Sequence, residues 1–234
     1  MQRCSSTNTL LLEDKGGGCV LLAAEAQSAG RGRRGRRWHS APGAGLTFSL
    51  ARRVRRPLRE LAGLSLVAGV AVSRALRGLG VARAALKWPN DIVVDGAKLG
   101  GILVETRPEN GSIRAVIGVG INCRRDSALA LRLGRKIGFL DQYIPIERNL
   151  ILKTIAQTLL DALHTFEAHG LEPLRREWEG MDAHAGQRLR VRLAGGRMVS
   201  GIASGLTGDG SLRLTTRQGV RAVSSGRVVS SRSA

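Results

Sequence analysis

The stretch that most constrains the fold is Gly30–Trp38, which reads GRGRRGRRW. Five arginines and three glycines occupy its first eight positions, and a tryptophan follows. A hydrophobic core cannot bury so much charge, and this much glycine suits neither a helix nor a strand. The sequence therefore predicts a flexible cationic loop, called the arginine loop below, between strands expected at 19–24 and 44–52.

The overall charge has two possible explanations. The chain has 234 residues and a formal net charge of +19, which usually indicates an anionic partner. Only five residues are lysine, however, and arginines are scattered along the whole chain. A residue usage biased toward arginine would give the same excess, so the net charge alone does not establish nucleic-acid binding.

Cysteine usage and apolar runs bear on the compartment. Cys4, Cys19 and Cys123 have no metal-ligand or redox spacing, and their odd number argues against a disulfide framework. The first residues lack the apolar segment of a signal peptide, and no run reaches the length of a membrane span. We therefore expect a cytoplasmic protein that does not contact a membrane.

Hydrophobic periodicity predicts an α+β fold. A helix capped by Ser6 or Thr7 is expected first, followed by longer helices at 57–80 and 147–170 and a short one at 172–181. Further strands are expected at 84–89 and 112–123. Residues 91–106 are expected to form a hairpin with a type I′ turn at Asp95-Gly96.

The sequence changes character near residue 182. From there, short strands are separated by Gly-Gly, Gly-Asp-Gly and Gln-Gly turns, which is typical of a small β-barrel or sandwich. Two domains are therefore predicted, at 1–182 and 183–234.

Three short motifs place polar residues at strand ends or beside glycines: KWPND at 87–91, KLGGILVE at 98–105 and GVGIN at 118–122. Each has a structural explanation when it is taken singly. The double glycine suits either a β-bulge or a close approach of backbone or ligand, Lys98 could lie on the surface, and Asn122 could belong to a turn.

Taken together and in order, Ser6-Thr7-Asn8, QSAGRGRRGRRW at 27–38 and these three motifs resemble the biotin–protein ligases. The resemblance extends to SGRVV at 225–229 and so covers nearly the whole chain. It implies a class II synthetase-like catalytic domain on a mixed, mostly antiparallel sheet, and an SH3-like C-terminal domain.

The resemblance also implies an activity, that of an ATP-dependent biotin–[biotin carboxyl carrier protein] ligase. Biotin's carboxylate attacks the α-phosphate of ATP to give biotinyl-5′-AMP and pyrophosphate, and a lysine of a carrier domain then takes the biotinyl group. Biotin and ATP are the substrates and Mg²⁺ is the expected ion. Concentrated positive charge suits this reaction because a carboxylate and a triphosphate repel each other.

Site residues follow from the same resemblance. Biotin-binding residues are expected at Ser6, Thr7, Asn8, Gln27, Arg31, Gly32, Arg33, Trp38, Lys98 and Gly101. ATP or adenylate contacts are expected at Arg31, Arg33, Lys87, Asn90, Lys98 and Asn122. The catalytic residues are expected to be Lys98, Arg33 and Asp91, and no metal ligand is assigned.

Several roles stay open at this level. Trp38 either closes the loop over biotin or packs in the core, and Asp91 either orients or deprotonates the incoming lysine or caps a turn. Ile137 or Phe139 is expected to cover adenine, within the stretch 124–145 that least resembles the family.

Few residues precede Ser6, so we expect a monofunctional ligase without an N-terminal DNA-binding domain and without sequence-specific DNA binding. A homodimer is the favoured assembly. The alternative functions are a lipoate–protein ligase and a non-catalytic, arginine-rich nucleic-acid-binding protein.

Overall fold

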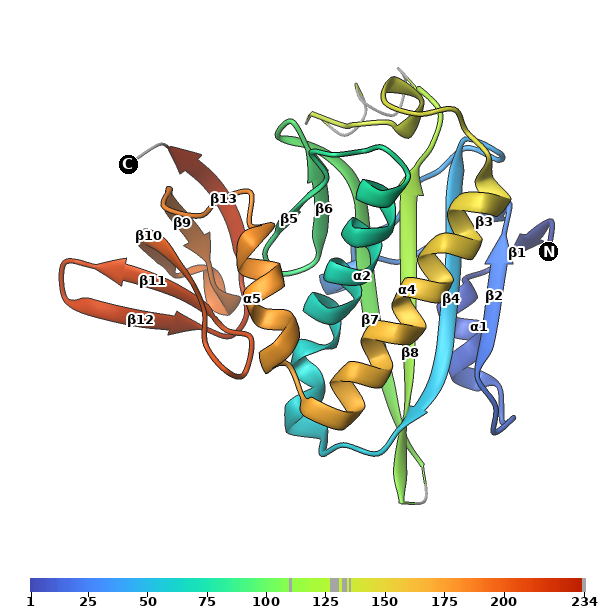
Figure 1. Ribbon diagram of the computed structural model, residues 1–234, viewed down its shortest axis with the longest axis horizontal. Coiled ribbons are helices and arrows are strands. Elements are labelled where there is room, and N and C mark those ends of the chain that lie inside the picture. Colours follow the sequence, from blue (N-terminus) through green and yellow to red (C-terminus); the bar gives the residue numbers. More distant parts are fainter. Residues whose placement is uncertain (110, 127–130, 132–133, 135, 233–234) are drawn as a thin grey trace.

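The computed structural model describes residues 1–109, 111–126, 131, 134 and 136–232. A six-stranded sheet carries helices on both faces, and a five-stranded sheet formed by the C-terminal residues lies beside it (Figure 1). The predicted α+β class is confirmed.

The central sheet has the strand order β2-β4-β8-β7-β6-β5, and all neighbouring strands in it are antiparallel. Its strands are β2 (Val20–Ala24), β4 (Gly45–Val54), β5 (Ala85–Lys87), β6 (Asp91–Val94), β7 (Ala97–Glu109) and β8 (Ser112–Asn122). The short strands β1 (Arg3–Cys4) and β3 (Ala26–Gln27) pair in parallel beside it. Asp95 and Gly96 have φ of 50° and 72°, as the predicted type I′ turn requires.

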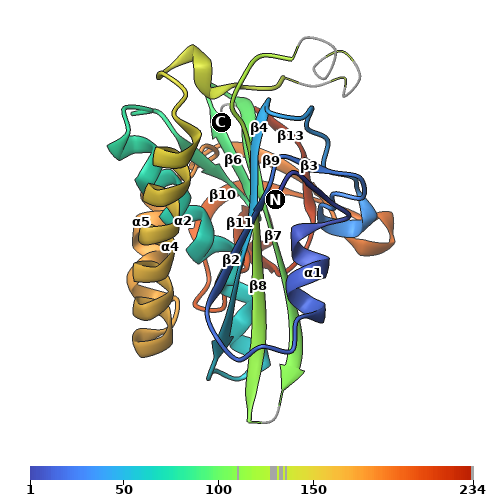
Figure 2. The same cartoon turned by 90° about the vertical axis from the view of Figure 1, so that its right-hand side faces the viewer.

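Helices cover the sheet on two sides, as the edge-on view shows (Figure 2). Helix α1 (Thr7–Glu13) lies on one face, and α2 (Leu64–Gly78) and α4 (Arg148–His169) pack together on the other. Helix α5 (Glu172–Gly180) leads to the C-terminal sheet. Short 3₁₀ segments are η1 (Arg33–Gly35), η2 (Leu58–Gly63), η3 (Leu140–Gln142) and η4 (Ala194–Gly196).

The expected helix at 57–80 differs in two respects. Its first part, η2, is a 3₁₀ segment rather than an α-helix, and it leaves Leu58 57% exposed. The stretch Leu58–Gly78 is also long and apolar enough to cross a membrane by length and composition, contrary to the expectation from the sequence. Because 72% of its most apolar window is buried inside the fold, packing against the sheet and α4 accounts for its apolar character.

The C-terminal sheet has the order β12-β11-β10-β9-β13. Its strands are β9 (Arg188–Arg192), β10 (Met198–Leu206), β11 (Leu212–Thr216), β12 (Gly219–Val223) and β13 (Arg227–Arg232). Leu189 and Val191 of β9 belong to the same buried cluster as Trp88, which follows β5. The two parts of the chain therefore share one continuous apolar core.

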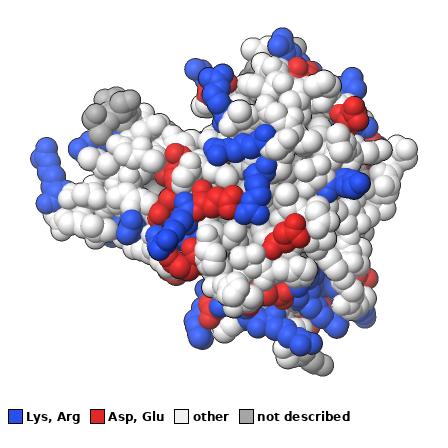
Figure 3. Space-filling model, viewed as in Figure 1, with Lys and Arg blue, Asp and Glu red and all other residues white. Residues whose placement is uncertain are grey.

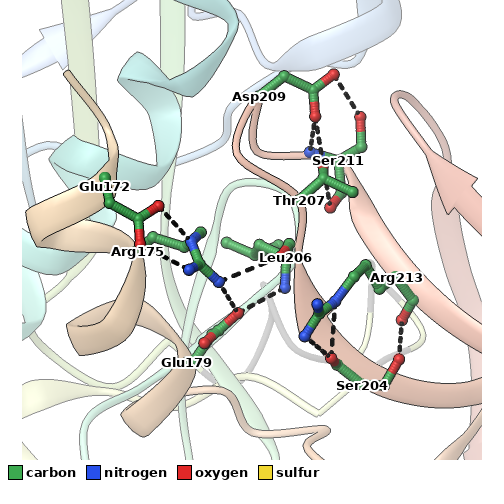
Figure 4. A network of polar contacts seen from close by, with 9 residues as sticks. All are labelled: Glu172, Arg175, Glu179, Ser204, Leu206, Thr207, Asp209, Ser211 and Arg213. Carbon is green, nitrogen blue, oxygen red and sulfur yellow. Dashed lines mark hydrogen bonds and ion pairs between the residues drawn. The ribbon is translucent and has the colours of Figure 1, made fainter.

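A polar network also fastens α5 to the C-terminal sheet (Figure 4). Glu179 Oε1 accepts hydrogen bonds from the backbone N–H of Leu206 at 2.8 Å and from Arg175 Nη1 at 3.0 Å. Arg175 also pairs with Glu172 at 2.7 Å. Because Glu179 satisfies a backbone donor on the neighbouring sheet, its removal would leave that donor without a partner.

We expect Glu179→Ala to lower the free energy of unfolding by about 1–3 kcal/mol, the usual effect of orphaning a buried donor. Glu177→Ala is the matched control on the same helix. Glu177 pairs with Arg74 where both side chains are more than 30% exposed, so its loss should cost less than about 1 kcal/mol. Urea denaturation measures the free energy of unfolding of both variants. An equal decrease in the two would show that the contact of Glu179 with Leu206 contributes no more than a surface ion pair.

Candidate active site

One cavity of about 430 Å³ lies between α1, the arginine loop, β6–β8 and β13. It collects residues from Ser6 near the start of the chain to Val229 near its end. The predicted site residues on its wall are Ser6, Thr7, Asn8, Gln27, Arg31, Gly32, Arg33, Trp38, Lys87, Asn90, Asp91, Lys98 and Gly101.

The cavity floor is a chain of hydrogen-bonded hydroxyl and amide groups. The backbone N–H of Thr7 donates to Gln27 Oε1 at 2.8 Å, and its hydroxyl lies 3.2 Å from the same oxygen. Ser49 Oγ lies 2.7 Å from Thr7 Oγ1 and 2.5 Å from Asn8 Oδ1, and Asn8 Nδ2 donates to Glu105 at 2.8 Å. This floor presents donors and acceptors together, which suits a small neutral molecule that carries both.

Glycines on β8 make room for these side chains. A Cβ atom on Gly118 would lie 2.3 Å from Asn8 Oδ1, and one on Gly120 would lie 2.4 Å from the Trp38 ring. Trp38 therefore packs directly on the sheet, and its buried indole N–H has no hydrogen-bond partner within the described part of the chain. The structure thus combines the two alternatives for Trp38, because its ring is packed and also lines the cavity.

The double glycine of β7 reflects both a bulge and a close approach. Ile92 of β6 pairs with Gly100 while Val93 pairs with Lys98, so the residue between them is bulged. A Cβ atom on Gly100 would lie 2.7 Å from the carbonyl oxygen of Gly120. Bulges re-aim neighbouring side chains, and this one precedes the stretch where β7 borders the cavity.

Lys98 is held rigidly at the cavity wall. Its Nζ forms an ion pair with Asp91, and the two side chains are 16% and 24% exposed. Its backbone N–H donates to Lys136 O at 3.1 Å, and its carbonyl accepts from Gly138 N at 2.9 Å. An ammonium group in so sheltered a position is suited to bind an anionic group of a ligand.

The arginine loop closes on itself above the cavity. Trp38 N donates to Gly30 O at 2.9 Å, and Gly32 N donates to Arg36 O at 2.7 Å. Burial lowers the pKa of Arg33, the neighbouring Arg34 lowers it further, and Asp91 partly opposes them. An anion in the cavity would stabilise the charged form of Arg33 and so offset the two effects that lower its pKa.

Asn122 is the predicted residue that the structure does not place on the cavity wall. It is 7% exposed, and its amide donates to the carbonyls of Lys98 at 3.2 Å and Gly138 at 3.3 Å. It therefore holds the segment at 136–138 against β7. Ile137 and Phe139, the candidates to cover adenine, are likewise absent from the described lining of the cavity, and Phe139 is 7% exposed.

Sequence reasoning missed two groups of residues. Glu105 joins the floor to the loop, because it accepts from both Asn8 and Arg31, the latter at 2.9 Å. Its place in KLGGILVE gave no sign of a partner 74 positions away. The second group, Gly226–Val229, brings β13 into the cavity wall. Only the docking of the C-terminal sheet could reveal that contribution.

Two partly buried titratable groups, Asp182 and His184, lie where the chain passes to the C-terminal sheet. Burial lowers the pKa of His184 to about 4, with a further contribution from Lys87. Burial also raises the pKa of Asp182 to about 6. At neutral pH His184 is therefore uncharged and adds no positive charge beside Lys87.

We expect Glu105→Gln to loosen the arginine loop, because it removes the ion pair with Arg31. Cleavage by trypsin after Arg31–Arg37 should become about two- to fivefold faster, as the loss of a partly exposed ion pair implies. Glu109→Gln is the control, since Glu109 pairs with Arg53 and Arg107 farther along β7. Mass spectrometry of early fragments measures the rates, and equal protection of the loop in both variants would contradict the anchoring role.

Comparison with known proteins agrees with this geometry. The Biotin/lipoate A/B protein ligase family matches residues 1–122, and the Biotin protein ligase C terminal domain matches residues 184–230. The chain is similar to the biotin protein ligase of Aquifex aeolicus solved with biotin and ATP, with a TM-score of 0.84, 24% identity and coverage of 100% of this chain and 97% of that one. This likeness shows the fold.

Sequence relatives give the same assignment. The chain is 36% identical over 217 residues to the bifunctional ligase/repressor BirA of Escherichia coli K12, which covers 89% of this chain and 66% of that protein, slightly less than two thirds of its length. It is 33% identical to the biotin–[acetyl-CoA-carboxylase] ligase of Mycobacterium tuberculosis H37Rv over 96% of this chain and 85% of that protein. The chain belongs to the biotin/lipoate A/B protein ligase family.

Proposed function

We propose that this chain is an ATP-dependent biotin–protein ligase, which forms biotinyl-5′-AMP and transfers biotin to one lysine of a biotin carboxyl carrier domain. One observation carries the proposal: a single cavity joins a hydroxyl and amide floor to Lys98 and to the arginine loop. The names of the relatives, which include biotin–[acetyl-CoA-carboxylase] ligases, support it.

The floor favours biotin over lipoate. Biotin's ureido ring has two N–H donors and one carbonyl, which complement Ser6, Thr7, Asn8 and Gln27. The dithiolane ring of lipoate offers no such groups, so it would make no hydrogen bonds to the nearly buried Thr7 and Asn8, each 3% exposed. Trp38 provides an apolar surface for the rest of the bicyclic body.

In the first step an oxygen of biotin's carboxylate forms a bond to the α-phosphorus of ATP. The bond between that phosphorus and the bridging oxygen to the β-phosphate breaks, and pyrophosphate leaves with the electron pair. Lys98 binds the carboxylate and holds it in line, while Arg31 and Arg33 offset the repulsion between the two anions. Lys87 and Asn90 also line the cavity, and we assign them to the phosphates of ATP.

Mg²⁺ fits this site only as a companion of the nucleotide. The described lining contains one carboxylate, Asp91, and no cluster of three acidic, His or Cys side chains occurs among the described residues. Magnesium commonly binds through substrate phosphates and one or two carboxylates. The ion would neutralise part of the triphosphate charge, and Asp91 is the protein group available to it.

In the second step the amine of the carrier lysine bonds to the acyl carbon, and AMP leaves with the bridging oxygen. The amine must lose a proton, since its ordinary pKa is about 10.4. Asp91 is paired with Lys98 before any ligand binds. Lys98 turns to the biotin carboxylate in the first step and holds the acyl oxygen of the adenylate in the second, so Asp91 becomes able to orient the incoming ammonium group and accept its proton.

The remaining assignments rest on the same proposal. Residues 1–182 form the catalytic unit and 183–234 an SH3-like unit that completes the cavity wall. The acceptor is the carrier domain of a biotin-dependent carboxylase, and the three free cysteines suit a reducing cytoplasm. A homodimer through sheet edges is the assembly we expect.

The proposed activity is tested by biotin-dependent exchange of labelled pyrophosphate into ATP, with lipoate as the competing substrate. Exchange with biotin and not with lipoate is the expected result. Lys98→Met should slow exchange about 10²- to 10³-fold, because it removes the group that binds the reacting carboxylate. Lys153→Met on the exposed side of α4 is the control and should keep the parent rate. Exchange without biotin, or none at all, would overturn the proposal.

The arginine loop should retain the adenylate. Arg33→Gly removes a partly buried guanidinium from the cavity wall, so we expect biotinyl-5′-AMP to escape and to modify bystander lysines. Mass spectrometry of albumin mixed with enzyme, biotin and ATP measures this, with Arg55→Gly as a control outside the cavity. If albumin stays as unmodified with Arg33→Gly as with the parent, the loop does not retain the adenylate.

A further inference from the structure

The C-terminal sheet differs from the rest of the chain in its charge balance. Residues 183–234 contain nine arginines, no lysine and one carboxylate, Asp209. A biased residue usage would replace lysine by arginine, but it does not account for the near absence of Asp and Glu. The imbalance therefore calls for an explanation of its own.

Among the described residues before position 183, about half of the arginines form ion pairs with carboxylates. Examples are Arg74 with Glu177 at 2.5 Å and Arg148 with Glu25 at 2.6 Å. Among the described residues, no ion pair involves an arginine of the C-terminal sheet, and Asp209 is hydrogen-bonded to Ser211 and Thr207. Figure 3 shows the contrast, with red and blue atoms side by side over the helices and blue without red at the far left edge.

Four of these arginines form a ladder that starts at the active-site cavity. Arg227 of β13 lies on the cavity wall and directly opposite Arg192 of β9. Arg190 and Arg188 follow on the same outward face of β9, since the residues between them are buried. Like charges directly opposite one another destabilise a sheet, so an anionic partner would stabilise this arrangement.

The ladder ends at a second, shallower hollow of about 530 Å³. Arg188, Arg217 and Arg221 border it, and Met198 and Ile202 give it an apolar floor. The ladder and the hollow together form one surface, called the arginine face, which consists of Arg188, Arg190, Arg192, Arg217, Arg221 and Arg227.

We propose that the arginine face docks an acidic surface of the acceptor protein domain, so that the acceptor's lysine enters the cavity beside Arg227. The inference rests on the proposed function, which requires a folded macromolecule to reach this cavity. Two observations select this partner over a nucleic acid: the face is continuous with the cavity wall, and its hollow has an apolar floor suited to side chains. Complementary charge would raise the association rate and fix the orientation of the acceptor.

The test uses four variants of the full chain. Arg188, Arg190 and Arg192 are changed together to Gln or, conservatively, to Lys, and Arg190→Gln alone is the mildest change. The matched control changes Arg55, Arg59 and Arg176 to Gln, which removes the same charge from exposed positions outside both the face and the cavity. The probe is an isolated biotin carboxyl carrier domain, and its KM and kcat are measured as ionic strength is varied.

We expect the triple Gln variant to raise KM for the carrier domain about tenfold and to flatten its salt dependence. Biotin-dependent pyrophosphate exchange, which needs no carrier, should stay at the parent rate and certifies that the same preparation is folded. The triple Lys variant and the matched control should keep KM near that of the parent. Arg190→Gln should raise KM for the carrier domain about twofold, and it replaces the triple Gln variant in the test if that variant does not fold.

The inference is overturned if the triple Gln variant keeps the parent KM for the carrier domain, or if the matched control raises that KM equally. It is also overturned if the triple Gln variant loses only the binding of a fluorescein-labelled DNA or RNA duplex. The last result would assign the face to nucleic acid. Failure of the parent chain to exchange pyrophosphate would instead reject the proposed function, so the two failures are distinguishable.

Discussion

The active site depends on backbone positions where no side chain is tolerated. Gly118 and Gly120 on β8 let Asn8 and Trp38 reach the face of the sheet, and side chains there would overlap them at less than 2.5 Å. The positions of helix α1 and of the arginine loop both depend on the space that these two glycines leave. Helix α1 can bring its first turn to the floor of the cavity, and the arginine loop can fold back so that its closing tryptophan rests on the strand.

Electrostatics then divides the arginines of the chain by purpose. On the helices and the central sheet several of them, such as Arg74 and Arg52, pair with carboxylates in surface ion pairs, each of which contributes little stability. In the arginine loop Arg31 pairs with Glu105, whereas Arg33 has no ion pair among the described residues and Asp91 acts on its pKa without such a contact. Net charge, which first suggested a polyanion, is thus a poor guide, whereas the location of unpaired guanidinium groups is informative.

Much of the fold could be predicted from the sequence because its signals are local. The Asp95-Gly96 turn, the Ser6 cap and the Gly170 helix end each depend on a few neighbouring residues, and the structure has all three. Contacts between distant segments carry no such signal. Glu105 accepts hydrogen bonds from Asn8 and Arg31, which lie far from it in the sequence. Asn122 points inward and donates to the carbonyl of Lys98. Neither role could be seen from the order of residues alone.

The shared cavity wall limits how this enzyme could be rebuilt from parts. Gly226, just before β13, has no room for a Cβ atom, since one would lie 2.6 Å from Val191. Trp88, which follows β5, donates to Gly210 O at 3.3 Å. A chimera that carries the C-terminal sheet of a relative would therefore change both the packing between the two sheets and the wall of the cavity. Exchange of whole modules is a poor route to new specificity here, and point changes within one wall are the better one.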